Sequence, residues 1–364
     1  MDQDGSSSLA PRAAAELIGH ERAEAELGAC LASGRLPHGW LIGGPSGIGK
    51  ATLAYRFARY LLSRRAGEGA AGDLLAGEAS GLQVSPSDPV FRQVAAGAHP
   101  DLITIERAVS ERTQALSAVI RVEQIRKLIH FFTLTAGRDG WRIAIIDGAD
   151  EMNPNAANAL LKVLEEPPER ALLLLVAHAP NRVIATIRSR CRKLQLRPLA
   201  DEQVAECLAA QLPDMAAADR VALARLAEGR PGRALALAGQ GGLDAYRELI
   251  ELFADLPRLD YDRLHALGDR LGRREQAGAF AIWMDLLALW LNRLVLAGAG
   301  RRPQEAVPGE RQLGHRLLAA RGLDQWLGLW EKVCRLATRA ESAHLDRKHV
   351  VLNAVLAVEA TARG

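Results

Sequence analysis

The sequence predicts an α/β protein: a domain with a parallel sheet, followed by an all-helical lid and an all-helical C-terminal domain. Up to about residue 197, short apolar runs alternate with segments that carry apolar residues at helical spacing, an order typical of a doubly wound parallel sheet. Beyond that point the pattern is helical throughout. We therefore expect four segments: a disordered tail at 1–14, the α/β domain at 15–197, the lid at 198–245 and the C-terminal domain at 246–364.

The bulk composition agrees with a helix-rich protein that has several cores. The chain has 364 residues, 49% of them hydrophobic and only 4% aromatic, and its abundant Ala, Leu and Arg are good helix formers. Its four cysteines have no CxxC spacing, which argues against a disulfide framework and against a zinc cluster. The N-terminus lacks the pattern of a secretory signal. We expect a cytoplasmic protein.

Two further features argue against other classes. The most apolar stretch, residues 280–298, is interrupted by Asp285, Asn292 and Arg293, which are costly in lipid, so we expect a core helix and no membrane contact. The formal net charge is +3, and acids are interspersed among the arginines. That distribution is a weak argument for nucleic-acid binding, which needs locally clustered basic charge.

The first elements lead to and from the glycine-rich loop. We expect a helix at 15–27, a short strand at 38–44 and a helix at 50–62. Residues 64–98 are rich in Gly, Ala, Glu and Ser and have little periodicity, which predicts a flexible insertion. Order resumes at HPDLITIER (99–107), a strand.

The remaining elements of the α/β domain follow the same alternation. A helix is expected at 121–135, then a strand in GWRIAIIDGADEMN (140–153) that is buried on both faces. Pro154 near the start and Pro167-Pro168 at the end delimit the next helix. The run at 171–180 is a further buried strand, and a short helix then leads into a final strand.

The stretch GGPSGIGKAT (43–52) has the composition of a phosphate-binding loop. Glycines allow backbone N–H groups to point at phosphates, the following helix start favours negative charge, and a lysine reaches the outer phosphates. Gly44, Gly47, Gly49 and Lys50 supply these parts. Because the loop lies between an expected strand and an expected helix, we predict a phosphate-loop fold.

The same region lacks parts that hydrolysis requires. The hydroxyl that normally follows the lysine ligates Mg²⁺, and Ala51 cannot replace it; Thr52 is rotated by about 100° around the helix. Asp147 ends the apolar run in the position of a metal-binding acid, but Gly148 stands where a water-orienting glutamate is expected. Asp150 and Glu151 lie nearby, where we expect them to cap the helix that starts near Pro154.

Two later motifs, NALLKVLEEPPE and TIRSRCRKLQL, complete a recognisable set. Together with the phosphate loop, and in this order, they resemble the clamp-loader subunits of bacterial DNA polymerase III, a branch of the AAA+ ATPases. The resemblance runs from about Leu17 through the Ser189-Arg190-Cys191 triplet and weakens in the helical C-terminal third. It implies a P-loop AAA+ domain, a helical lid and a helical oligomerisation collar.

The resemblance also implies partners and a role for Arg190. Such subunits form a hetero-pentamer of the tau/gamma and delta kinds, which loads a sliding clamp onto primer-template DNA, with each ATP site lying between neighbours. Arg190 would be an arginine finger that reaches into the neighbour's site, because a guanidinium presents a charged planar fork to phosphate oxygens. The residues alone leave a local salt bridge at a helix end as the alternative. Cys191 needs no role beyond packing.

Within that branch the sequence is similar to a member whose own site has decayed. In EGRPGRALAL (228–237), Gly232 stands where active relatives have a sensor arginine, and Arg233 is displaced by one position. With Ala51 and Gly148 this makes three departures, which argue against turnover, while ATP binding without hydrolysis remains open. Relatives commonly carry a four-cysteine zinc module after the phosphate-loop helix; residues 64–98 contain no cysteine, so no zinc is expected.

The C-terminal helices carry four tryptophans that have two interpretations. They could fill a core, or they could anchor subunit contacts in the collar, since interface hot spots favour Trp. The sequence does not separate these roles for the four residues, which are Trp283, Trp290, Trp326 and Trp330.

The leading hypothesis is a mainly scaffolding subunit that offers Arg190 to a neighbouring ATPase during DNA replication and has no polymerase activity of its own. The alternative from another class is a working, tau/gamma-like clamp-loader ATPase in which Thr52 and Asp150 or Glu151 compensate for the losses. An unrelated P-loop helicase or kinase is a third reading, against which the Ser-Arg-Cys triplet argues.

Overall fold

The computed structural model describes residues 10–64, 82–108, 117, 119–134, 140–342 and 345–364. The chain divides into two compact units, Met1–Leu199 and Ala200–Gly364. Each unit has its own core, and each is described by itself. The further boundary near residue 245 stays a prediction.

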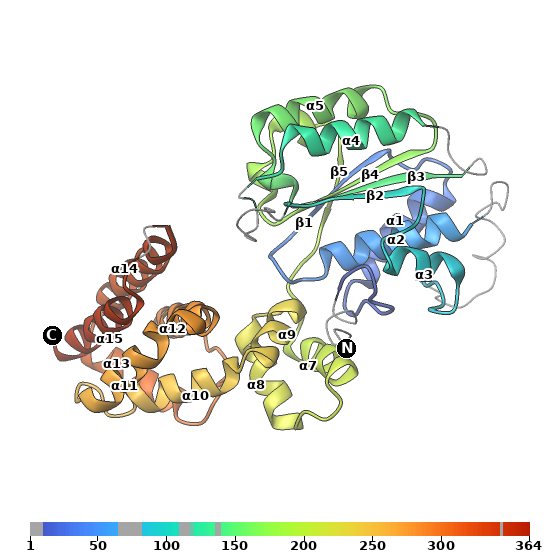
Figure 1. Ribbon diagram of the computed structural model, residues 1–364. Coiled ribbons are helices and arrows are strands. Elements are labelled where there is room, and N and C mark those ends of the chain that lie inside the picture. Colours follow the sequence, from blue (N-terminus) through green and yellow to red (C-terminus); the bar gives the residue numbers. More distant parts are fainter. Residues whose placement is uncertain (1–9, 65–81, 109–116, 118, 135–139, 343–344) are drawn as a thin grey trace. The chain divides into compact units, whose positions relative to one another are not determined.

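The first unit is built on five parallel strands. Their order across the sheet is β2-β3-β4-β1-β5 (Figure 1). The strands are β1 Gly39–Gly43, β2 Leu102–Ile105, β3 Arg142–Asp147, β4 Ala171–Ala177 and β5 Arg192–Gln195. The central strand β4 is buried along its whole length, as expected for a strand covered on both faces. The predicted parallel sheet is therefore confirmed.

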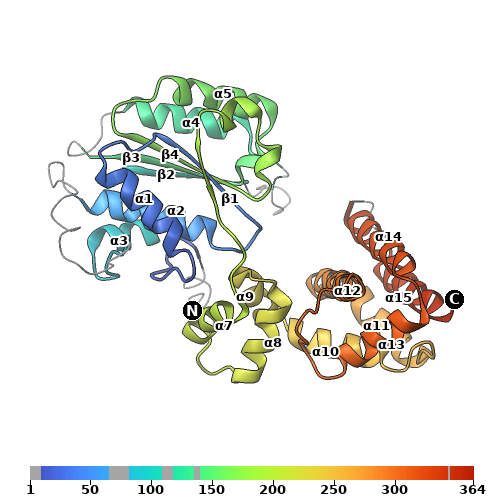
Figure 2. The same ribbon diagram turned by 180° about the vertical axis from the view of Figure 1, so that it is seen from behind.

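Helices cover both faces of this sheet (Figures 1 and 2). The first group is α1 Glu21–Ala32, α2 Lys50–Ser63 and α3 Pro89–Ala95; the second is α4 Val122–Thr133 and α5 Pro154–Glu165, followed by the short α6 Ala185–Arg188. Side chains of β3 alternate between the faces: Ile143 and Ile145 pack with the first group, and Ala144 and Ile146 with the second. The sheet is thus the middle layer of three.

Helix α3 lies in the range 64–98, where the sequence predicts a flexible insertion. Its start is fixed by Asp88, whose carboxylate accepts a hydrogen bond from the Val90 backbone N–H at 2.7 Å, and by Pro89 in the first turn. Phe91 and Val94 are buried. The prediction is therefore wrong for residues 82–98, while residues 65–81 lie outside the described ranges.

The N-terminal segment is held by arginines of α2. The Arg59 guanidinium donates to the carbonyl oxygens of Arg12 at 2.9 Å and Ala14 at 2.6 Å, and Arg56 donates to that of Ala15 at 2.6 Å. These carbonyls are therefore not used in a helix, and α1 begins at Glu21, later than predicted. The predicted disorder of the tail is contradicted for residues 10–14, and residues 1–9 lie outside the described ranges.

In the parts of the second unit that the structure describes, all regular elements are helices. They are α7 Asp201–Gln211, α8 Ala217–Ala227, α9 Pro231–Gly239, α10 Gly242–Phe253, α11 Tyr261–Gly272, α12 Ala277–Gly298, α13 Glu310–Ala320, α14 Leu323–Ser342 and α15 Arg347–Arg363 (Figure 2). This confirms the predicted succession of an α/β domain and helices.

Helix α12 is the central helix of this unit and packs against α10, α11 and α14. By length and composition it is the one described helix that could cross a membrane. Its Trp283 and Trp290 are nevertheless buried, as is the ion pair between Arg293 and Glu310. This packing is that of a core helix.

The four tryptophans divide by burial. Trp283, Trp290 and Trp326 are core residues of this unit, and Trp330 is half-buried.

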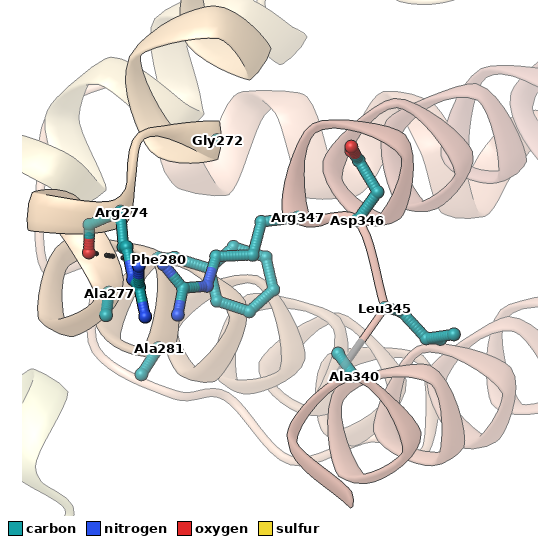
Figure 3. Close-up of a pocket in the computed structure, with 9 residues that line it drawn as sticks. All are labelled: Gly272, Arg274, Ala277, Phe280, Ala281, Ala340, Leu345, Asp346 and Arg347. Atoms are coloured by element: carbon teal, nitrogen blue, oxygen red, sulfur yellow. Dashed lines mark hydrogen bonds between the residues drawn. The ribbon is translucent and has the colours of Figure 1, made fainter. Parts of the chain in front are cut away.

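The start of α15 is tied to the start of α12 by Arg347. Its guanidinium lies over the Phe280 ring, 5.9 Å from the centroid, and donates to the carbonyl oxygen of Arg274 at 3.4 Å (Figure 3). A cavity of about 480 Å³ opens beside it, lined on the other side by Ala340 and Leu345. Arg347 thus holds the N-terminal ends of α12 and α15 together.

Candidate functional site

The predicted phosphate loop connects β1 to α2, in the position that the motif requires. Gly49 forms the N-cap of α2 with φ of 103°, a left-handed conformation that favours glycine. A Cβ at this position would lie only 3.2 Å from Leu17 Cδ1. The Leu17 side chain and the His20 ring, which bonds to the Ile48 carbonyl at 2.7 Å, therefore close over the loop.

Lys50 is buried inside the loop. It is 3% exposed, and its ammonium group donates to the Pro45 carbonyl oxygen at 2.6 Å. Burial lowers the pKa of Lys50 to about 8, although the nearby carboxylates of Asp147 and Asp150 act in the opposite direction. The lysine thus faces the loop, where an anionic phosphate would raise its pKa.

Asp147 ends β3 on the same edge of the sheet as the phosphate loop. Burial raises the pKa of its carboxyl group, while His178 and Lys50 partly offset this effect. The fold therefore brings Lys50 and Asp147 together, as the sequence predicts for a nucleotide site. Thr52 follows Ala51 on α2 and is half-buried.

The Glu151 side chain approaches Gly148, the position at which the sequence analysis expects a water-orienting glutamate in an active ATPase. Gly148 has φ of 88°, and a Cβ there would lie 2.5 Å from Glu151 Oε2. Glu151 is in turn paired with Arg107, with 3.0 Å between Nε and Oε2. The carboxylate that approaches Gly148 is therefore already paired with an arginine.

Asp150 connects two strand ends instead of capping a helix. Its carboxylate accepts hydrogen bonds from the backbone N–H groups of His178 at 3.0 Å and Ala179 at 2.9 Å. Burial alone would raise the pKa of Asp150, but these N–H groups hold it below its ordinary value. The cap of α5 is Asn153, which accepts from Ala156 N at 2.8 Å. The capping prediction was wrong for Asp150, and the Asn-Pro pair was the signal that pointed to Asn153.

Arg190 lies at the edge of the sheet where the parallel strands begin, and the phosphate loop lies at the opposite edge, where they end. Arg190 stands two positions before the start of β5, whereas the loop follows β1, and the two strands are parallel neighbours. Its Nη2 atom is 2.8 Å from Oε1 of Glu165, and its Nη1 atom donates to the Thr186 carbonyl at 3.1 Å. The local salt bridge that the sequence left open is therefore present, and Arg190 cannot serve the nucleotide site of its own chain.

The neighbours of Arg190 have packing and turn-forming roles. The Ser189 hydroxyl donates to the Thr186 carbonyl at 3.0 Å. Cys191 is buried, and burial raises its thiol pKa to about 12, so the thiol is unreactive at neutral pH.

Glu165 is the residue of this constellation that the sequence analysis missed. It lies in the LEEPP motif, whose acids stand at a helix C-terminus, where the macrodipole disfavours negative charge. That unfavourable position was the available signal for a cationic partner.

The arginine near the expected sensor position is engaged within the second unit. Arg233 pairs with Glu228 at 3.1 Å and with Asp285 at 2.5 Å, and its side chain is 14% exposed. Gly232 precedes it in α9. Within the described ranges, no group of three side chains is arranged to hold a metal ion.

Comparison with known proteins identifies the relatives of this chain. The family model described as "DNA polymerase III, delta subunit" matches residues 19–200, half of the chain. DNA polymerase III subunit delta′ of Pseudomonas aeruginosa is 38% identical over 216 residues, which are 59% of this chain and 60% of that protein. The chain therefore spans less than two thirds of that relative in the alignment.

Other relatives support the same placement. The delta′ subunit of Escherichia coli is 31% identical over 266 residues, 72% of each chain. The tau subunit of Escherichia coli is 30% identical over 240 residues, 63% of this chain and 33% of tau. Taken with the parallel sheet and the phosphate loop, these matches show that the chain belongs to the delta′ subunit family of DNA polymerase III.

Proposed function

We propose that this chain is a mainly scaffolding subunit of a clamp loader that supplies Arg190 in trans to a neighbouring ATPase subunit. The observation that carries the proposal is the position of Arg190 at the sheet edge opposite to its own phosphate loop. A guanidinium at that edge lies away from its own phosphate loop, which supports a role at the site of another chain. Its side chain is 37% exposed, so a neighbour can reach it.

The proposal includes a nucleotide site that does not hydrolyse ATP. The helix start offers Ala51 instead of a metal-binding hydroxyl, and Gly148 offers no water-orienting group. Glu151, which could compensate, is paired with Arg107, and Asp150 is occupied by two backbone N–H groups. The glycines and Lys50 remain in place, which supports ATP binding without turnover.

The partners follow from the family. The relatives are named as delta′ and tau subunits of DNA polymerase III, which supports membership of a multi-subunit complex. We propose tau/gamma and delta subunits as neighbours in a hetero-pentamer, and a sliding clamp and primer-template DNA as the objects on which the complex acts. We expect this assembly in the cytoplasm.

The test of the finger is Arg190→Ala in the reconstituted complex. We expect normal assembly by size-exclusion chromatography and loss of ATP turnover at the adjoining site, because a finger contributes about a thousandfold or more to the rate. Arg190→Lys should rescue little, since an ammonium group lacks the planar fork. Arg192→Ala, which removes a nearby exposed arginine paired with Glu26, is the control and should keep the wild-type rate. Unchanged turnover with Arg190→Ala would refute the role.

The competing function is a working ATPase of the tau/gamma kind, supported by the intact lysine and Asp147. It is tested on the purified chain with clamp and DNA, where ATP turnover is compared with that of Lys50→Ala. We expect no turnover that depends on Lys50. Turnover lost in that variant would show that the chain hydrolyses ATP itself.

A further inference from the structure

We propose that Glu165 is a positioning residue that holds Arg190 on its own chain until a neighbouring subunit presents a triphosphate. The inference rests on the proposed function, because it concerns when the finger becomes available. It assigns a role to a residue outside the phosphate loop and outside the Ser-Arg-Cys triplet.

The guanidinium uses both of its terminal nitrogens within the chain. Nη2 contacts Oε1 of Glu165 at 2.8 Å, and Nη1 donates to the Thr186 carbonyl at 3.1 Å. These are the groups that a phosphate-binding fork would offer to γ-phosphate oxygens. In this orientation Arg190 is held by its own chain. The contact with Glu165 must break before the guanidinium can bind a phosphate.

Glu165 occupies a position that a helix alone does not favour for an acid. It is the last residue of α5, and Glu166 forms the C-cap. Negative charge at a helix C-terminus faces the negative end of the macrodipole. The Arg190 guanidinium compensates this charge, so the acid and the arginine form a matched pair across 25 residues of sequence.

The backbone on both sides of the pair is fixed by packing and hydrogen bonds. Leu164 and Cys191 are buried against Gly39, where an added Cβ would lie 3.0 Å from Leu164 Cδ2 and 3.3 Å from Cys191 Sγ. The Arg190 backbone N–H is bonded to the Ile187 carbonyl at 3.1 Å. Opening of the pair is therefore a side-chain movement that leaves the backbone in place.

The pair is weak enough to open when a better acceptor arrives. The two side chains are 37% and 49% exposed, and ion pairs in such surroundings contribute little because water and salt screen them. A triphosphate carries more negative charge than a carboxylate and accepts a guanidinium in the same bidentate way. The neighbour's nucleotide can thus replace Glu165 as the partner of Arg190.

The experiment is Glu165→Gln in the reconstituted complex, with ATP turnover measured over a range of ATP concentrations. We expect the ATP concentration for half-maximal turnover to fall two- to fivefold, because the competing anion is gone; fivefold corresponds to about 1 kcal/mol. The maximal rate should not change, since the engaged geometry is the same. In an Arg190→Ala background, Glu165→Gln should have no effect.

Glu166→Gln is the matched control. It removes the same charge from the same helix end, and its exposed side chain forms no ion pair with any residue in the described ranges. It should leave the ATP dependence unchanged. If both variants lower the ATP concentration for half-maximal turnover equally, the effect is one of general charge. If Glu165→Gln lowers the maximal rate, Glu165 orients Arg190 while it contacts the phosphate. Either result overturns the proposal.

The two proposals fail in different ways. If Arg190→Ala lowers turnover and Glu165→Gln leaves the ATP dependence unchanged, Glu165 does not hold back Arg190. The arginine-finger role of Arg190 is then still supported. If Arg190→Ala has no effect, both are wrong. Thermal unfolding of both Gln variants shows whether the chain remains folded.

Discussion

The Lys50 ammonium illustrates how much one buried charge can lower the stability of the folded chain. It is buried against the Pro45 carbonyl, and its pKa of about 8 lies well below the ordinary 10.5. The unfolded chain therefore binds more protons than the folded chain between about pH 8 and 10.5. Because of this difference, the Lys50 contribution destabilises the fold at neutral pH, and the free energy of unfolding rises with pH across that window.

We predict that Lys50→Met increases the free energy of unfolding at pH 7 by up to about 3 kcal/mol, the energy equivalent of the pKa shift. At pH 10.5 the difference between the variant and the wild type should be much smaller, since Lys50 is then neutral in the folded chain. Urea unfolding at the two pH values measures this. Lys162→Met, a change at an exposed lysine of α5, should show no comparable pH dependence. A difference that is the same at both pH values would contradict the prediction.

Gly148 has a backbone conformation and a neighbour that both disfavour a side chain at this position. Its φ of 88° disfavours any side chain, and Glu151 Oε2 lies only 2.5 Å from the place of an added Cβ. A glutamate introduced here meets both obstacles.

We therefore predict that Gly148→Glu, alone or with Ala51→Ser, produces no ATP hydrolysis by the purified chain. The substitution should also lower the free energy of unfolding by about 1 kcal/mol or more, because of the left-handed backbone and the collision with Glu151. Gly148→Ala separates the backbone effect from that of the carboxylate. Phosphate release and urea unfolding provide the measurements, and a variant with clear turnover would show that the geometry is adaptable.

At the scale of elements, α2 does more than follow the phosphate loop. Arg59 is 1% exposed and lies 4.3 Å above the Phe91 ring of α3, with its terminal nitrogens on the carbonyls of Arg12 and Ala14. One side chain thus joins α2, α3 and the segment before α1.

We predict that Arg59→Ala lowers the free energy of unfolding by about 2–4 kcal/mol, since it removes charge-assisted hydrogen bonds and buried packing together. Backbone amides between residues 13 and 20 should exchange faster, because the carbonyls that Arg59 holds are released. Hydrogen exchange followed by mass spectrometry measures both. Arg22→Ala, at an exposed arginine of α1, is the control; equal protection in the two variants would exclude this role for Arg59.

The elements that the sequence predicted well are those set by local patterns. The strands β3 and β4 are unbroken apolar runs, and α5 is delimited by prolines, so each could be located from its own residues. The start of α1 was missed because Arg56 and Arg59, about 45 residues away, use the carbonyls that would have extended it. Helix α3 was missed because seven residues carry too little periodicity.

The same division applies to the site at the scale of the whole molecule. The phosphate loop is contiguous in the sequence, so Gly49 and Lys50 could be predicted together from one motif. Asp150 binds N–H groups 28 and 29 residues away, and Glu165 meets Arg190 across a stretch of chain that includes β4 and α6; neither contact leaves a local pattern. Long-range hydrogen bonds and ion pairs depend on the packed fold and become visible only there.

Arg190 and the phosphate loop lie at opposite ends of the strands, so the α/β unit presents two different surfaces to its neighbours. In the proposed function, the cation at one end of the sheet meets the phosphate loop of a neighbouring chain, so copies or homologues of such a unit associate head to tail through two different surfaces. In such a row we expect this chain to supply its arginine to one neighbour, and we expect no turnover at its own phosphate loop. We therefore expect such a chain at a terminus of the row, where only one of the two surfaces has to take part in hydrolysis.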